Sequence, residues 1–221
     1  MKRVFITGGS RGIGRATCET FAAHGWEVVA PTRQELELSD AASIEAFVAK
    51  CRGTAFDAIV NNAGINDIHC IEDVTDEEIE RMMAIDLIAP IRLLRGLVPD
   101  MKRNGGGKIV NIGSIWAVVS KPGRALYSAA KNGVHGLTNT LAVELAPDNI
   151  LVNTLCPGFT RTELTSKNNT PEQIAAIEKD IPMGRMAEPE EIARVAYFLC
   201  SEENTYLTGQ KITVDGGFTE R

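Results

Sequence analysis

The chain has 221 residues, of which 44% are hydrophobic and 24% are charged, a composition typical of one soluble α/β domain. The formal net charge of -6, without a long basic run, argues against a nucleic-acid-binding surface. No segment reaches about 18 consecutive apolar residues, and the first residues lead straight into a predicted strand. We therefore expect neither a membrane span nor a signal peptide, but a cytoplasmic protein. The cysteines have no metal-ligand spacing with the histidines, so we interpret them as reduced and expect no metal site.

A strand, a glycine-rich turn and a helix open the chain. Residues 4–6 are apolar, the turn contains Gly8, Gly12 and Gly14, and residues 15–24 have helical spacing of apolar side chains. Glycines let a backbone approach a pyrophosphate closely, and the N-terminus of the following helix offers unpaired N–H donors. Tight turns also use glycine, but the flanking strand and helix are the context that the motif requires. The opening residues therefore predict dinucleotide binding.

The predicted second strand, residues 25–30, ends without a carboxylate. An acidic residue at this point would bind the ribose 2′-hydroxyl of NAD(H) and repel the 2′-phosphate of NADP(H). Arg33 instead offers a guanidinium suited to a phosphate, and Arg11 in the glycine turn could provide a second. The sequence thus favours NADP(H) over NAD(H). The alternative is that Arg33 is a solvated loop residue and that Glu35 or Glu37 folds back onto the ribose.

Two further strands and a small turn follow. Leu36 and Leu38 alternate as in a short third strand, which leaves no room for a full helix before it. A helix capped by residue 39 or 40 then runs to about residue 50, and residues 56–60 form the fourth strand. The turn at residues 61–64 consists of Asn, Asn, Ala and Gly. Such small and amide residues let a backbone approach a ribose or nicotinamide, while a simple turn is the alternative.

The remaining chain alternates helices and strands without repeats or linkers, which predicts a single domain over residues 1–221. A capping box opens a helix at residue 75, and a long helix over 83–103 is expected to break near Pro90 and Pro99. The polar stretch 163–182 follows the C-terminal end of a strand and is a candidate lid over the substrate. The other predicted elements are strands at 108–113, 150–155 and 211–214, and helices at 127–145, 171–179 and 189–200.

Ser114, Tyr127 and Lys131 form the candidate catalytic group. Ser114 stands just past the C-terminal end of a predicted buried strand, where open α/β sheets bind ligands. Tyr127 and Lys131 are four residues apart, so on a helix they share one face. We expect the ammonium to stabilise the phenolate and lower the tyrosine pKa, which suits proton transfer with an alcohol or carbonyl oxygen. A solvated helix face would explain the same spacing.

Taken in order, these motifs resemble the short-chain dehydrogenase/reductase family. The closing segments Pro182–Arg185, Pro189–Ala193, Thr208–Gln210 and Asp215–Gly217 resemble the branch that includes 3-oxoacyl-acyl-carrier-protein reductases. The resemblance covers nearly the whole chain. The motifs that carry it are Thr7-Gly-X-X-X-Gly12-Ile-Gly14, Asn61-Asn-Ala-Gly64, Ser114, Tyr127-X-X-X-Lys131, and Pro157-Gly158 with Thr162.

The resemblance implies one parallel sheet of about seven strands between two helical layers, and hydride transfer between a nicotinamide cofactor and a carbonyl or alcohol. Tyr127 would pass the proton, Ser114 would orient the substrate oxygen, and Lys131 would bind the nicotinamide ribose. Trp116, Phe159 and Ile65 follow strand ends and could line the substrate pocket, with plain core packing as the alternative. A homodimer or homotetramer is also implied. The implied cofactor-binding residues are Gly8, Ser10, Arg11, Gly12, Ile13, Gly14, Arg33, Asn61, Ala63, Gly64, Tyr127, Lys131, Pro157, Gly158, Thr160 and Thr162.

Three departures from the family pattern limit what can be carried over. Asp86 stands where the family usually places an asparagine whose helix kink holds a water for the proton relay, so we expect an altered pH profile. Glu37 stands where an aspartate usually meets the adenine edge, and the helix after the second strand is missing. A non-catalytic dinucleotide sensor or scaffold remains the alternative, although such a module needs no phenol beside an ammonium.

Overall fold

A parallel sheet forms the centre of the protein. The computed structural model describes residues 1–220, with residue 167 described by its backbone alone. Within them the sheet has six strands in the order β2-β1-β3-β4-β5-β6, and every neighbouring pair is parallel. This is the predicted doubly wound α/β fold of Rossmann type. The strands are β1 (Arg3–Ile6), β2 (Glu27–Val29), β3 (Ala58–Asn61), β4 (Gly107–Ile112), β5 (Ile150–Pro157) and β6 (Lys211–Val214).

The prediction of about seven strands was wrong at the strand expected around Leu36 and Leu38. This segment forms turns, because Glu35 accepts hydrogen bonds from the backbone and hydroxyl of Thr32 and the Leu36 N–H donates to the Thr32 carbonyl. Such local bonds compete with a strand ladder. Leu36 is buried against the core beside the sheet without pairing to a strand.

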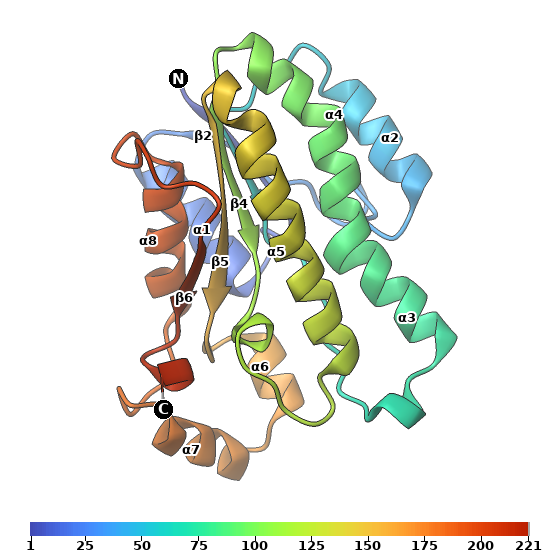
Figure 1. Cartoon of the computed structure of the whole chain (residues 1–221), viewed down its shortest axis with the longest axis vertical. Coiled ribbons are helices and arrows are strands. Elements are labelled where there is room, and N and C mark those ends of the chain that lie inside the picture. The colour runs from blue at the N-terminus through green and yellow to red at the C-terminus, as the bar shows by residue number, and fades with distance from the viewer. Residues whose placement is uncertain (221) are drawn as a thin grey trace.

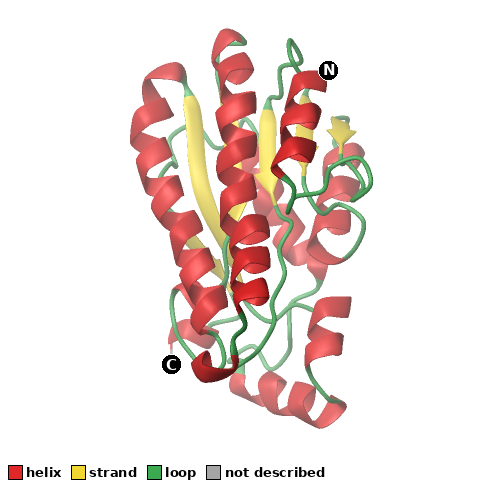
Figure 2. Ribbon diagram, turned by 90° about the vertical axis from the view of Figure 1, so that its right-hand side faces the viewer, coloured by secondary structure: helices red, strands yellow, loops and turns green. Residues whose placement is uncertain are grey.

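Helices cover both faces of the sheet. In Figure 1, α1 (Gly12–Ala23) and α8 (Pro189–Cys200) lie on one side, and α2 (Ala41–Lys50), α4 (Ala89–Arg103) and α5 (Ala125–Leu145) on the other. Figure 2 shows the strands between the helical layers. Strand residues alternate between two cores, as the pleat requires. Phe5 and Ile59 pack toward α2 and α4, whereas Val4 and Val60 pack toward α1 and α8.

A π-helical turn interrupts the long helical segment. α3 (Asp76–Met83) begins at the predicted capping box of Thr75, and the turn Ala84–Ile88 separates it from α4. The break expected near Pro90 is this turn, which ends two residues before the proline. The break expected near Pro99 does not occur, because the helix continues past it to Arg103. The turn brings Asp86 into the protein interior.

The segment after β5 forms two helices beyond the carboxyl ends of the strands. They are α6 (Glu163–Asn168) and α7 (Pro171–Asp180), which lie at the lower end of Figure 1.

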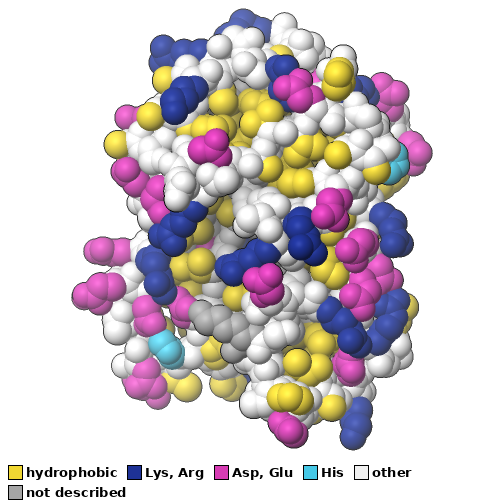
Figure 3. Space-filling view, turned by 180° about the vertical axis from the view of Figure 1, so that it is seen from behind, with side chains coloured by type: hydrophobic (Ala, Val, Ile, Leu, Met, Phe, Trp, Pro, Cys, Tyr) yellow, Lys and Arg dark blue, Asp and Glu magenta, His cyan; other side chains and the backbone are white. Residues whose placement is uncertain are grey.

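Acidic and basic side chains are interspersed on the face shown in Figure 3. Among the described residues, no helix is both long and apolar enough to cross a membrane.

Candidate active site

The glycine turn follows β1 at the carboxyl edge of the sheet. Gly8 and Gly12 have φ angles of 68° and 52°, which glycine adopts without strain. A Cβ at Gly14 would lie 2.1 Å from the Gly8 carbonyl oxygen, so no side chain fits there. α1 has no side-chain cap and no acidic residue in its first turn. Its N–H groups are therefore available to a phosphate, and the turn fits a dinucleotide.

Asn62 joins the glycine turn to the turn after β3, a role that the sequence analysis missed. Its side-chain amide donates to the carbonyls of Thr7 (3.0 Å) and Gly8 (3.2 Å). The Thr7 hydroxyl in turn accepts from the backbone N–H groups of Asn62 and Ala63. A Cβ at Gly8 would lie 3.0 Å from the Ala63 Cα, so small residues on both turns allow this approach.

Ser114, Tyr127 and Lys131 come together beside these turns, as predicted. Lys131 Nζ lies 5.5 Å from the ring centroid of Tyr127 and donates to the carbonyl of Ile112 at 3.1 Å. Ser114 lies two residues after the end of β4, and its hydroxyl accepts a hydrogen bond from the N–H of Trp116. The Ser114 hydroxyl lowers the pKa of Tyr127.

The net pKa shift of Tyr127 is opposite to the one predicted. Burial raises the pKa of the phenol above its ordinary value, and the nearby Asp86 carboxylate raises it further. Lys131 and Ser114 lower the pKa, as expected, but do not outweigh burial. The four-residue spacing in the sequence identified Lys131 as the neighbouring cation, but it gave no measure of how far Tyr127 is removed from water.

Asp86 forms a buried ion pair with Lys131. Its Oδ2 lies 3.2 Å from Lys131 Nζ, and its Oδ1 accepts from the N–H of Ile65 at 2.9 Å. Burial raises the pKa of Asp86, while Lys131 and the Ile65 N–H lower it. Burial lowers the pKa of Lys131, but Asp86 and Tyr127 outweigh it, so the net shift is upward. Gly64 allows this packing, because a Cβ there would lie 2.9 Å from the carboxylate and 3.1 Å from the ammonium.

Comparison with known protein families identifies this arrangement. A family model described as enoyl-(acyl carrier protein) reductase matches residues 34–219, and one described as short chain dehydrogenase matches residues 2–42. The chain belongs to the short-chain dehydrogenase/reductase family. It is 35% identical to the 3-oxoacyl-acyl-carrier-protein reductase FabG of Escherichia coli (strain K12) in an alignment of 236 positions that covers 98% of this chain and 96% of the relative.

Solved structures of the family have the same fold. A putative NAD(P)-dependent gluconate 5-dehydrogenase from Beutenbergia cavernae, with bound NADP, is 31% identical and has a TM-score of 0.94, over 100% of this chain and 97% of the other. A 3-ketoacyl-(acyl-carrier-protein) reductase from Brucella melitensis, complexed with NADH, is also 31% identical, with a TM-score of 0.91 over 99% and 98% of the two chains. The chain is thus an oxidoreductase of this family, and its relatives bind nicotinamide dinucleotides.

Of the residues after β5 that were predicted to bind the cofactor, one lies close to the glycine turn. A Cβ at Gly12 would lie 3.1 Å from the methyl group of Thr162, which also caps α6. Thr160 is buried, and its hydroxyl donates to the carbonyl of Gly158. Pro157 is the last residue of β5. Of this group, Thr162 has the most direct contact with the predicted dinucleotide site.

Other predicted cofactor residues differ in their exposure. Ser10 and Arg11 are exposed at the turn, whereas Ile13 packs against the core on the α1 and α8 side. Asn61 is buried, and its amide donates to the Asn111 side chain on β4 at 2.8 Å. Its side chain therefore joins two strands of the sheet.

The basic residues expected near the adenosine ribose each pair with a carboxylate. Arg33 Nε lies 2.5 Å from Glu37, and Arg11 lies 3.4 Å from Glu163 on α6. The Arg33 side chain is 84% exposed, so it is free to exchange partners. The Arg33 hydrogen bond, together with bonds from Ser39, lowers the pKa of Glu37 to about 2.

The two predicted substrate-pocket aromatics belong to one cluster. The rings of Trp116 and Phe159 meet edge to face at 5.9 Å, and Phe218 near the C-terminus contacts both. Trp116 is buried. Core packing, the alternative to a pocket role, therefore accounts for part of what these rings do. Because they follow β4 and β5, they also lie at the edge of the sheet that carries Ser114.

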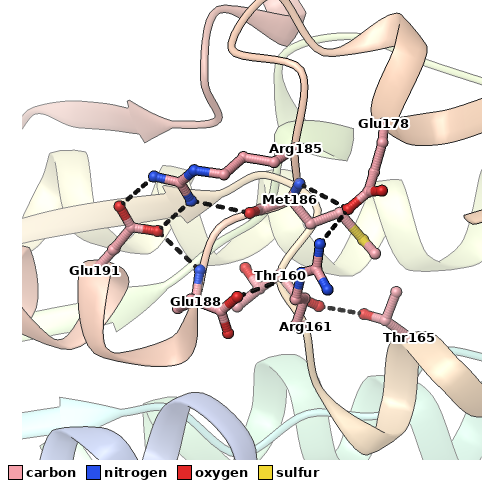
Figure 4. A network of polar contacts seen from close by, with 8 residues as sticks. All are labelled: Thr160, Arg161, Thr165, Glu178, Arg185, Met186, Glu188 and Glu191. Atoms are coloured by element: carbon pink, nitrogen blue, oxygen red, sulfur yellow. Dashed lines mark hydrogen bonds and ion pairs between the residues drawn. The ribbon is translucent and has the colours of Figure 1, made fainter. Parts of the chain in front are cut away.

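Ion pairs hold the candidate lid to the rest of the protein. Arg161 lies 2.6 Å from Glu178 on α7 and 3.3 Å from Glu188, which caps α8 (Figure 4). Arg185 makes two hydrogen bonds to Glu191 on α8. The end of α7 is thus fastened to the segment that follows β5.

Arg124 is a further residue that the sequence analysis missed. It lies three residues before Tyr127, at the N-cap position of α5. The available signal was its position, one turn from the tyrosine. A loop arginine is normally solvated, however, and the sequence carries no mark of its burial.

Proposed function

We propose that this dehydrogenase/reductase transfers hydride between a nicotinamide dinucleotide and a carbonyl or secondary alcohol substrate. The proposal rests on one observation, the position of the Lys131 ammonium 5.5 Å from the centroid of the Tyr127 ring, beside Ser114 and the glycine turn. A binding module needs no phenol next to an ammonium, whereas this pair suits an enzyme that protonates a substrate oxygen.

In this proposal Tyr127 passes the proton to or from the substrate oxygen. Burial raises the pKa of Tyr127 and so favours the protonated phenol, which suits carbonyl reduction. Ser114 orients the oxygen by a hydrogen bond. Lys131 limits the rise in the tyrosine pKa and offers N–H donors to ribose hydroxyls. A bound nicotinamide supplies or accepts the hydride, and the chain supplies orientation and charge.

The dinucleotide would be held along the carboxyl edge of the sheet. The glycine turn and the first N–H groups of α1 would bind the pyrophosphate. Ala63 and Gly64 would let the backbone approach a ribose, and residues 157–162 would bind the carboxamide. Asp86 would act on Lys131 and Tyr127 through its charge.

NADP(H) is the preferred cofactor in this proposal, with Arg33 bound to the 2′-phosphate. The carboxylates that could instead bind a ribose hydroxyl are already engaged, since Glu35 accepts from Thr32, and Glu37 from Ser39 and Arg33. We expect Arg33→Asp to weaken NADPH binding by at least about tenfold, because one charge-assisted bond is worth roughly 1.5–3 kcal/mol. NADH affinity should not fall, because an aspartate at this point can bind the ribose 2′-hydroxyl. Titration of both cofactors tests this, with Arg52→Asp, which replaces an exposed arginine, as the control. Equal NADPH affinity in wild type and Arg33→Asp would show that Arg33 does not bind the 2′-phosphate.

The substrate class and assembly are part of the same proposal. A 3-oxoacyl thioester is suggested by the FabG relative, and a sugar acid by the relative named a gluconate 5-dehydrogenase. Residues 163–182 would act as a lid over either substrate. We further propose one cytoplasmic domain that assembles as a homodimer or homotetramer.

Activity with a panel of ketones and alcohols tests the reaction type. Each compound is followed by the absorbance of the reduced cofactor, with wild type, Tyr127→Phe and the control Tyr206→Phe, whose side chain is exposed. We expect turnover that Tyr127→Phe reduces by at least about a thousandfold, roughly 4 kcal/mol in transition-state free energy. Dinucleotide binding without turnover that depends on Tyr127 would favour a sensor or scaffold.

A further inference from the structure

Arg124 is a buried cation next to the proposed proton donor. Only 7% of the residue is exposed. Its guanidinium carbon lies 5.2 Å from the centroid of the Trp116 ring, and Nη1 donates to Asn66 Oδ1 at 2.9 Å. Tyr127 lies one helical turn further along α5, and Arg124 lowers its pKa. The guanidinium therefore packs on a predicted substrate-pocket aromatic, one helical turn from the proposed proton donor.

No carboxylate within the described chain pairs with this cation. The neighbouring Tyr127 phenol raises the pKa of Arg124, but burial lowers it by more. Nε is buried and has no hydrogen-bond partner among the described residues. Burying a cation without an anion costs several kcal/mol by general estimates. The ring of Trp116 and one amide bond offset part of that cost.

The guanidinium of Arg124 keeps donor capacity that the described residues do not use. Nη1 donates to Asn66, while Nε has no partner among them. A guanidinium offers its N–H groups in a planar fork that matches the two oxygens of a carboxylate. Asn66 also joins this group to the candidate lid, because its backbone carbonyl accepts from the Asn168 side chain on α6. A substrate under the lid would thus meet the guanidinium and the phenol together.

We propose that the carbonyl substrate carries a carboxylate and that Arg124 binds it. The proposal rests on the proposed function and deepens it, because it assigns the substrate to the oxo acids and their hydroxy-acid products. Binding of the carboxylate fixes the distance between the reacting carbonyl and Tyr127. Neutral ketones would lack this anchor.

Charge selectivity tests the proposal. The substrates are straight-chain oxo acids with increasing spacing between carbonyl and carboxylate, each paired with its methyl ester. We expect wild type to prefer the best acid over its ester by about a hundredfold in kcat/KM, as a buried bidentate pair allows. Arg124→Gln should remove most of that preference, chiefly by raising the KM of the acid more than that of the ester. Arg124→Lys should be intermediate, and Lys121→Gln in the same loop should match wild type.

A structural role for Arg124 gives a different result. If Arg124→Gln lowers kcat/KM of acid and ester equally, or if wild type shows no preference for the acids, the proposal is wrong. Ester reduction that is lost in Tyr127→Phe would then still support the proposed function. Failure of every acid and ester to show turnover dependent on Tyr127 would instead count against the proposed function.

Fluorescence of Trp116 gives a readout that needs no turnover. The chain has two tryptophans, so the Trp26→Phe variant reports on Trp116 alone. Titration with butanoate, a carboxylate that cannot be reduced at a carbonyl, should change the emission in the presence of saturating cofactor, and butanamide should not. The change should disappear in Trp26→Phe combined with Arg124→Gln. An equal response to butanamide, or one that persists without the guanidinium, overturns the proposal.

Discussion

Replacing Asp86 with asparagine removes one buried negative charge and keeps the size of the side chain almost unchanged. Asp86 Oδ2 lies 3.2 Å from Lys131 Nζ, which lies 5.5 Å from the Tyr127 ring centroid, so the carboxylate is at most about 9 Å from that ring. The charge raises the pKa of Tyr127. Its removal therefore lowers that pKa.

The size of the effect follows from this distance. At an effective dielectric constant of about 20, unit charges about 9 Å apart interact by about 2 kcal/mol. That energy corresponds to a rate factor of roughly twenty- to thirtyfold where the phenolate is required. Alcohol oxidation needs the phenolate, so its kcat/KM should rise by about that factor at neutral pH in Asp86→Asn. Carbonyl reduction needs the phenol, so its decline with rising pH should begin at lower pH in the variant.

The assay is kcat/KM against pH in both directions for wild type and Asp86→Asn. Asp73→Asn, which removes an exposed carboxylate, is the matched control. The chain has three tyrosines, so ultraviolet titration with and without Tyr127→Phe also reports the phenol's pKa directly. Unchanged pH profiles and an unchanged Tyr127 titration in a folded Asp86→Asn variant would refute the electrostatic reasoning.

Gly64→Ala should lower kcat/KM by about tenfold or more, because the new methyl group would lie 2.9 Å from the Asp86 carboxylate and must displace it. Wild-type kinetics in this variant would show that the Asp86–Lys131 ion pair tolerates the displacement. Asn62→Ala should weaken dinucleotide binding by about tenfold, since two bonds to the glycine turn are lost, and calorimetric titration with an unchanged Kd would contradict this. Glu178→Gln weakens the Arg161 ion pair and should raise substrate KM severalfold while the free energy of unfolding changes by less than about 1 kcal/mol. A KM that stays at the wild-type value would separate this ion pair from lid closure.

The sequence by itself determined the elements whose signals are local. The glycine turn between β1 and α1 could be predicted because positive φ angles and close approach require glycine at fixed positions. Tyr127 and Lys131 could be paired because helical spacing places side chains four residues apart on one face. The capping box at Thr75 is likewise a local pattern of side-chain bonds.

Tertiary structure decided what depends on burial and on partners distant in the chain. The pKa of Tyr127 rises because desolvation, which no spacing reveals, outweighs the pull of Lys131. Leu36 has the alternation of a strand residue but is held in a turn by neighbouring side chains. The sequence singles out Asp86 by its place in the family pattern, but it shows the burial of neither Asp86 nor Arg124. Folding buries both, but it gives the carboxylate a lysine partner and leaves the guanidinium without a carboxylate, because long-range packing alone determines which charges meet.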